Sequence, residues 1–142
     1  MLDVNAITKQ LGSLSPAKQK EVLILLNELS EAKTRNAVQQ DFLSFVIEVW
    51  PAFIEGEHHK IMSDAFNRIA DGSLKRLIVN MPPRHTKSEF ASHLFPAWYL
   101  GRYPNKKVIQ TAHTAELAVG FGRKVRNLVG SSDYQKLFPD VS

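Results

Sequence analysis

The chain has 142 residues, 44% of them hydrophobic and 23% charged, with a formal net charge of +4, as expected of a soluble globular protein with one compact domain. The absence of cysteine excludes a disulfide framework and a thiolate metal site. No apolar stretch approaches the roughly 18 residues of a membrane span, and residues 1–5 lack the basic start of a signal peptide, so we expect a cytosolic protein without a membrane partner.

The first 50 residues predict an N-terminal helical segment. Residues 1–14 are expected to be loose, and Ser15 with Pro16 forms a helix start signal, a capping hydroxyl followed by proline. Residues 30–41 are polar and predict either a continued exposed helix or a linker. Helical spacing then resumes and stops at Pro51. The apolar positions of the two stretches are Val22, Leu23, Leu25, Leu26 and Leu29, then Val38, Phe42, Phe45, Val46 and Val49.

Residues 51–142 are predicted to form the N-terminal portion of a larger α/β domain, which begins with a loop and a helix. The loop covers residues 52–57 and contains Gly56. Apolar residues then recur at helical spacing from Ile61 to Ala70. The Asp-Gly-Ser sequence at 71–73 predicts the turn that follows this helix.

Residues 76–88, Arg-Leu-Ile-Val-Asn-Met-Pro-Pro-Arg-His-Thr-Lys-Ser, form the most informative motif. The apolar run 77–79 predicts a buried strand, a proline-containing loop follows, and Lys87 with Ser88 opens an amphipathic helix. This order predicts a phosphate-binding loop, in which backbone N–H groups and the positive end of the helix dipole face the phosphates. Lys87 would reach the β- and γ-phosphates, and Ser88 would place its hydroxyl on Mg²⁺. The candidate ATP-binding residues are Pro83, Arg84, His85, Thr86, Lys87 and Ser88, with Ser88 as the metal ligand.

The motif departs from the usual pattern at two positions. Met81 and Thr86 stand where glycines belong. Glycine takes positive φ at no steric cost, whereas a β-branched residue held there is strained by about 1–3 kcal/mol. The alternative interpretation is an ordinary strand-to-helix turn with an exposed lysine.

The chain after the motif predicts a helix, a second strand and another helix. Pro96 is expected to kink or end the first of these helices. Residues 108–111 predict the second buried strand, and Thr114 is expected to cap the last helix, which residues 130–132 close. Its predicted inner face is Leu117, Phe121, Val125 and Leu128. The alternating order from residue 76 predicts an α/β fold, with the first two strands of an incomplete P-loop NTPase-type parallel sheet preceded by N-terminal helices.

Charge and acidic residues set further expectations. Residues 102–136 contain seven lysines and arginines against two acidic residues, which indicates either a polyanionic partner or a solvated helix face. The histidines have no ligand-like spacing, and the adjacent His58 and His59 are not expected to share one helix face. Neither apolar run ends in acidic residues, so the carboxylates that hold Mg²⁺ and orient water during hydrolysis are missing.

The sequence from Lys75 to Glu89 resembles the start of the ATPase domain of large terminase subunits, the DNA-packaging motors of tailed bacteriophages. Residues 57–66, 95–101, 108–113 and 137–139 fit neighbouring segments of that family in the same order, so the resemblance covers about residues 42–141. It implies an ATPase that uses ATP and Mg²⁺. Carried over by position, Lys87 and Ser88 bind phosphate and Mg²⁺. Arg84 matches an arginine proposed in the family as an in-cis finger on the γ-phosphate, and plain surface charge is its alternative. The adjacent His58 and His59 lie where the family places part of its adenine-side region.

The resemblance also implies a function and partners for the whole motor. It would package double-stranded DNA into procapsids as a homo-oligomer, with the portal protein and the small terminase subunit. It would act in the host cytoplasm and transiently at the portal, and would not be a structural component of the virion. The Asp-Glu strand and a nuclease domain are expected beyond residue 142, so this chain alone is expected to be catalytically incomplete. Two alternatives stay open: a fragment of another P-loop DNA translocase or helicase, or a non-catalytic DNA- or protein-interaction module with a vestigial loop.

Overall fold

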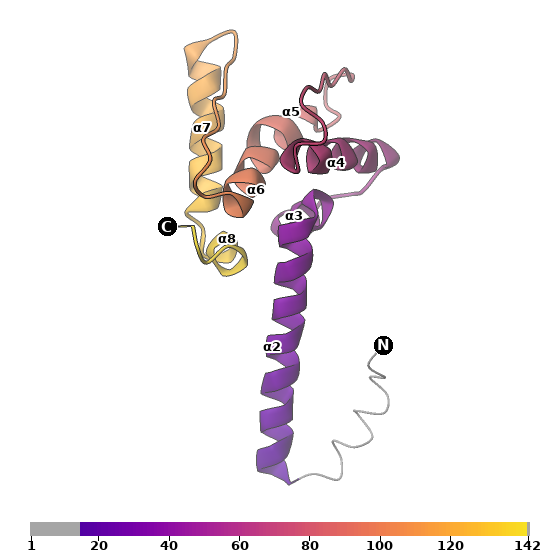
Figure 1. Ribbon diagram of the computed structural model, residues 1–142, viewed down its shortest axis with the longest axis vertical. Coiled ribbons are helices and arrows are strands. Elements are labelled where there is room, and N and C mark those ends of the chain that lie inside the picture. Colours follow the sequence, from indigo (N-terminus) through magenta and orange to yellow (C-terminus); the bar gives the residue numbers. More distant parts are fainter. Residues whose placement is uncertain (1–14, 142) are drawn as a thin grey trace. The chain divides into compact units, whose positions relative to one another are not determined.

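A computed structural model describes residues 15–141, so the segment 1–14 that was predicted to be loose lies outside the described residues. The chain divides into two compact units, Met1–Thr34 and Arg35–Ser142. The division that the sequence predicted between residues 50 and 51 stays a prediction. Figure 1 labels the α-helices, and the helices follow in chain order. They are α2 (Pro16–Gln40), α3 (Phe42–Val49), α4 (Glu57–Ala70), α5 (Lys87–Glu89), η1 (Phe90–Leu94), α6 (Phe95–Arg102), α7 (Ala115–Val129) and α8 (Ser132–Leu137).

The predicted α/β fold is wrong, because residues 15–141 are helical and contain no strand or sheet. Both segments predicted as strands, 77–79 and 108–111, are drawn as coil in Figure 1. The central side chains of these segments are exposed, with Ile78 at 93% and Ile109 at 89%. A strand exists only when a neighbouring strand accepts and donates its ladder hydrogen bonds, and neither segment has such a neighbour in the described chain.

The described part of the first unit is the N-terminal portion of α2. The helix begins at Pro16, as the start signal predicted, and it continues through the polar stretch to Gln40. The structure therefore has an exposed helix there and no linker. Most of its large apolar side chains are exposed: Leu23, Ile24, Leu25 and Leu29 retain 50–59% of their accessible surface.

The core of the second unit is built around Phe42 at the start of α3. Its side chain is fully buried, and the rings of Phe66, Phe90 and Phe95 meet it edge-on at 5.3–5.7 Å between centroids. Edge-to-face pairs of this kind stabilise beyond the burial of apolar area alone. The cap of α3 joins this core to α4, because Asp41 accepts from the Ser44 backbone N–H at 2.7 Å and from Asn67 Nδ2 at 2.8 Å.

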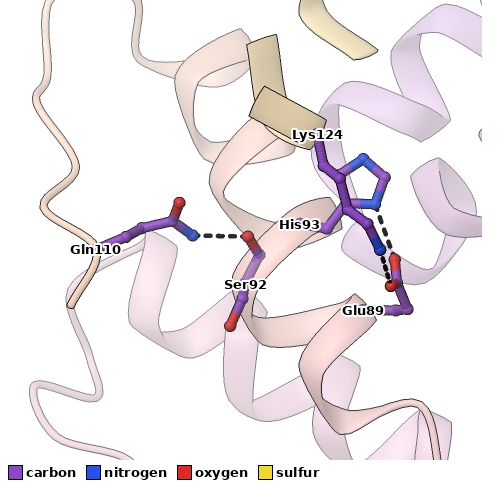
Figure 2. A network of polar contacts seen from close by, with 5 residues as sticks. All are labelled: Glu89, Ser92, His93, Gln110 and Lys124. Atoms are coloured by element: carbon purple, nitrogen blue, oxygen red, sulfur yellow. Dashed lines mark hydrogen bonds and ion pairs between the residues drawn. The ribbon is translucent and has the colours of Figure 1, made fainter. Parts of the chain in front are cut away.

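The segment after the loop at 81–86 is helical from Lys87 to Arg102, through α5, η1 and α6. Pro96 does not end it; a π-helical turn, η1, precedes the proline, which lies in the first turn of α6. Proline has no N–H to offer the carbonyl four residues earlier, which is that of Ser92. Gln110 Nε2 donates to this carbonyl at 2.6 Å instead, as Figure 2 shows.

The C-terminal helices close the core of the second unit. Thr114 Oγ1 caps α7 by accepting from the Leu117 backbone N–H at 3.3 Å, as predicted. Of the predicted inner face of α7, Val125 is buried, whereas Leu117 remains 40% exposed. From α8, the buried Tyr134 hydroxyl donates to the Ala97 carbonyl of α6 at 2.7 Å.

Candidate functional site

The six residues predicted to bind nucleotide lie in one loop and in the first turn of the helix after it. Thr86 is the N-cap of α5, which begins at Lys87. Pro83, Arg84, His85 and Ser88 are exposed, and Thr86 and Lys87 are half-buried. The first N–H groups of a helix have no partner within the helix, so this loop and helix start carry backbone donors as well as side chains.

The backbone of the loop is left-handed at two positions. Arg84 has φ 66° and Thr86 has φ 60°, and these are the only non-glycine residues with positive φ in the described part of the chain. The second of them stands where the usual phosphate-loop pattern has glycine, the residue that adopts this conformation without strain. The strain that the sequence predicted for a left-handed threonine is therefore present.

The side chain of Lys87 closes the loop on itself. Its Nζ donates to the Met81 carbonyl at 2.8 Å and lies 3.5 Å from the Pro82 carbonyl. An ammonium group has three donors, so at least one proton remains for an incoming acceptor. The lysine thus places a positive charge at the point where residues 81–87 close into a loop.

Thr86 is also held by a histidine from α4. Gly56 N–H donates to His59 Nδ1 at 3.0 Å, so the neutral imidazole carries its proton on Nε2. His59 Nε2 lies 2.7 Å from Thr86 Oγ1 and therefore donates to it. The Thr86 hydroxyl in turn donates to the His85 carbonyl at 2.7 Å. A single chain of hydrogen bonds with consistent direction joins the start of α4 to the loop.

His59 is buried, with 5% of its surface exposed, and it packs between two aromatic rings. Phe53 lies 4.7 Å and Phe90 lies 5.0 Å from the imidazole, centroid to centroid. Burial lowers the pKa of His59 below its ordinary value of 6.5, His58 lowers it further, and Glu55 offsets part of this change. The imidazole is therefore neutral at pH 7.

Sequence reasoning missed this role of His59. It expected the adjacent histidines to point to different faces, but the rings of His58 and His59 lie 3.8 Å apart, and His58 also meets His85 at 5.9 Å. His59 and Thr86 are 27 positions apart in the sequence, and no motif spacing connects them. The one available clue in the sequence was the backbone strain expected at Thr86, because a threonine at a glycine position needs a neighbour that holds it in the left-handed conformation.

The remaining side chains predicted for the loop differ in their contacts. His85 Nδ1 lies 2.9 Å from the Pro83 carbonyl, which tightens the tip of the loop. Within residues 15–141, the Arg84 guanidinium and the Ser88 hydroxyl make no hydrogen bond or ion pair, and both residues are exposed. Their side chains can therefore turn toward a ligand without losing an internal contact.

Glu89, two residues after Lys87, ties the helix after the loop to α7. Figure 2 shows its carboxylate between Lys124 of α7 and His93, whose Nδ1 lies 2.9 Å from Glu89 Oε2. Burial raises the pKa of Glu89, but the hydrogen bonds from Lys124 and His93 outweigh it, and the pKa falls below its ordinary value. This carboxylate is ionised and already engaged, so it is a structural group and no proton acceptor for the loop.

Other features of the described chain lie apart from the loop. An apolar groove of about 470 Å³ runs along the start of α7, lined by His113, Thr114, Glu116, Leu117, Gly120, Phe121 and Lys124. Arg123 and Arg126 are exposed on the same helix. Among the described residues, no three His, Asp or Glu side chains are arranged to hold a metal ion, and no helix is long and apolar enough to cross a membrane.

Comparison of the chain with protein-family models, with curated proteins and with solved structures finds no match in any of the three.

Proposed function

We propose that residues 81–88 bind the phosphates of ATP together with Mg²⁺. The observation that carries the proposal is the closed loop: Lys87 bonds back to the Met81 carbonyl at 2.8 Å, directly before a helix start. A loop that is closed by an ammonium group and followed directly by a helix start has donors that a polyphosphate needs. The proposal requires only this loop and the helix after it, and no sheet.

The donor set suits a magnesium nucleotide. Lys87 would hold the β- and γ-phosphates as a point charge, and Ser88 would hold Mg²⁺ through its hydroxyl. Arg84, exposed at a left-handed position at the loop tip, would contribute a second positive charge toward the γ-phosphate. When bound, the metal ion would neutralise phosphate charge. The described chain offers no free carboxylate beside the loop, so the proposed activity of this chain is binding, without hydrolysis.

We further propose that the chain is the ATP-binding part of a large terminase subunit, the motor that packages double-stranded DNA into procapsids. Support comes from the order of motifs from residue 42 to residue 141 and from the exposed arginines of α7. In this proposal the whole motor is an ATP hydrolase and a homo-oligomer that works with the portal protein and the small terminase subunit. It acts in the host cytoplasm and transiently at the portal.

A second candidate is a non-catalytic module that contacts DNA or a packaging protein through α7. The exposed Arg123 and Arg126 favour it, since arginines on one exposed helix suit a phosphate backbone. In that case duplex DNA should bind with a strong salt dependence, and Arg123→Ala with Arg126→Ala should weaken it, whereas Lys87→Ala should have no effect.

Calorimetric titration with Mg²⁺-ATP tests the first proposal. Lys87→Ala should weaken binding by about 30- to 100-fold, the size expected when hydrogen bonds to a charged group are lost. The matched control is Lys107→Ala, which removes an exposed lysine of a coil segment outside the loop and should leave binding unchanged. Equal affinity for the wild type and Lys87→Ala would contradict the assignment of the loop.

A further inference from the structure

The left-handed threonine needs an explanation that the loop itself does not supply. A β-branched residue in this region is strained and persists only when its surroundings fix it. The Arg84 side chain, at the other left-handed position, makes no polar contact within residues 15–141, whereas the Thr86 hydroxyl takes part in two hydrogen bonds, with His59 and with the His85 carbonyl. The structure thus fixes one strained position with a partner from another helix.

We propose that His59 is a positioning residue for the phosphate loop, and that its Nε2–H holds Thr86 in the left-handed conformation that glycine would otherwise provide. The inference rests on the proposed nucleotide binding and names a part of its machinery that lies 27 positions before Thr86 in the sequence. His59 would not touch the nucleotide. It would act through Thr86, whose conformation sets the direction of the N–H groups of Lys87 and Ser88.

The surroundings of His59 determine which of its nitrogens faces Thr86. Gly56 N–H occupies Nδ1, so only Nε2 can donate. Phe53 and Phe90 pack on the ring and prevent it from rotating away. A Cβ at position 56 would meet His58 Cε1 tightly at 3.0 Å, but would lie at an ordinary contact distance of 3.5 Å from His59 Nδ1.

The arrangement makes the loop sensitive to pH. A proton on Nδ1 would face the Gly56 N–H, donor against donor, and would break the chain of hydrogen bonds at its start. The charged and titratable groups around His59 are His58 on its own helix, Glu55 on the preceding loop, and His85, which meets His58 from the phosphate loop. Because the pKa of His59 lies below 6.5, the bond from Gly56 N–H to His59 Nδ1 is present at pH 7 and is lost as the pH falls through that lowered pKa, which releases the imidazole from the start of α4.

Two variants of His59 separate its two hydrogen bonds. His59→Gln places an amide N–H near the position of Nε2, so it keeps the donor to Thr86 and cannot titrate. His59→Asn keeps a polar group near Nδ1 for Gly56 but cannot reach Thr86. For Mg²⁺-ATP at pH 7.5, we expect affinity to fall about tenfold in His59→Asn and to stay within about threefold in His59→Gln. His59→Gln should also remove the part of the pH dependence that His59 causes.

The decisive comparison repeats both variants in a Thr86→Gly background. Glycine adopts positive φ without help, so the Thr86→Gly protein is the reference in which the loop no longer depends on His59. His59→Asn should then change the affinity by less than about twofold, because the bond that it removes no longer holds a strained residue. Equal losses in His59→Asn and His59→Gln, or an undiminished loss in the Thr86→Gly background, would overturn the inference.

A measurement without nucleotide separates the two proposals. Long-range ¹H–¹⁵N correlation spectra of the wild type should show His59 protonated at Nε2 alone at pH 7. Urea unfolding of His59→Asn, Thr86→Gly and the double variant should show that the two effects are not additive. If the wild type fails to bind Mg²⁺-ATP but this coupling is found, the proposed function is wrong and the positioning contact stands. An Nδ1-protonated tautomer or additive unfolding effects would refute the contact, whatever the nucleotide result.

Discussion

The loop at 81–88 and the apolar segments at 77–79 and 108–111 differ in what holds them, because the loop is closed by a bond of its own and the two segments form no strand. The loop closes within six residues through the bond from Lys87 to the Met81 carbonyl, and only Thr86 at its end is also held by a distant residue, His59. The two segments need a partner strand, and their central residues, Ile78 and Ile109, remain exposed. Hydrogen bonds between residues close in the sequence can be inferred from the spacing of those residues, whereas strand pairing depends on residues far away in the sequence.

The same contrast applies to the apolar residues. Phe42 and Ile78 both look like core residues in the sequence, but Phe42 is fully buried among aromatic rings and Ile78 is 93% exposed. Leu77 and Val79, on either side of Ile78, pack against the core at its edge. The alternation indicates an extended segment whose one face is covered and whose other face is open.

The largest expected effect tests this contrast directly. Phe42→Ala should lower the free energy of unfolding by about 3–5 kcal/mol, the cost of a large cavity in an aromatic core. Ile78→Thr should change it by less than about 0.5 kcal/mol, as for an exposed position. Urea unfolding followed by circular dichroism measures both, and Phe42→Leu provides a milder variant that stays folded. A comparable loss in Ile78→Thr would mean that the segment is buried in solution.

Two helical glycines offer a smaller and sharper comparison. Replacing glycine by alanine within a helix normally stabilises by about 0.5–1 kcal/mol. At Gly101 in α6, however, the new Cβ would lie 2.6 Å from the buried ring of Phe138, so Gly101→Ala should destabilise by about 1–3 kcal/mol. At Gly120 in α7 nothing lies within 4 Å, and Gly120→Ala should stabilise. Thermal unfolding of the two variants should therefore shift in opposite directions, and parallel shifts would argue against the close packing of Gly101 on Phe138.

Helix ends were predictable because their chemistry is local. Ser15 with Pro16 marks the start of α2, and Thr114 marks the start of α7, as the structure confirms. The six loop residues came together because they are contiguous, and the strain at Thr86 followed from the rule for glycine positions. His59 could not be found in this way, because its bond to Thr86 depends on how Phe53 and Phe90 pack on the ring.

The strands were mispredicted for a related reason. A short apolar run has the same composition whether it pairs with another strand, packs on a helix or lies open. The run at 77–79 packs one face on the core through Leu77 and Val79, and Ile109 is open. Gln110, which was part of a predicted strand, instead uses its side chain to reach the carbonyl that Pro96 leaves free. That contact could not be predicted, because it depends both on a proline inside a helix and on a coil segment beside that helix.

The smallest expected effect concerns the hydrogen bond from Gln110 to the Ser92 carbonyl. Gln110→Ala removes the donor to the half-buried Ser92 carbonyl and should lower the free energy of unfolding by about 0.5–1.5 kcal/mol. Gln135→Ala, on an exposed position of α8, is the matched control and should have little effect. Hydrogen exchange of residues 107–113 should be fast already in the wild type, because none of their backbone N–H groups donates a hydrogen bond. Slow exchange there would instead mean that the segment is held by a strand partner, because a paired strand protects its N–H groups.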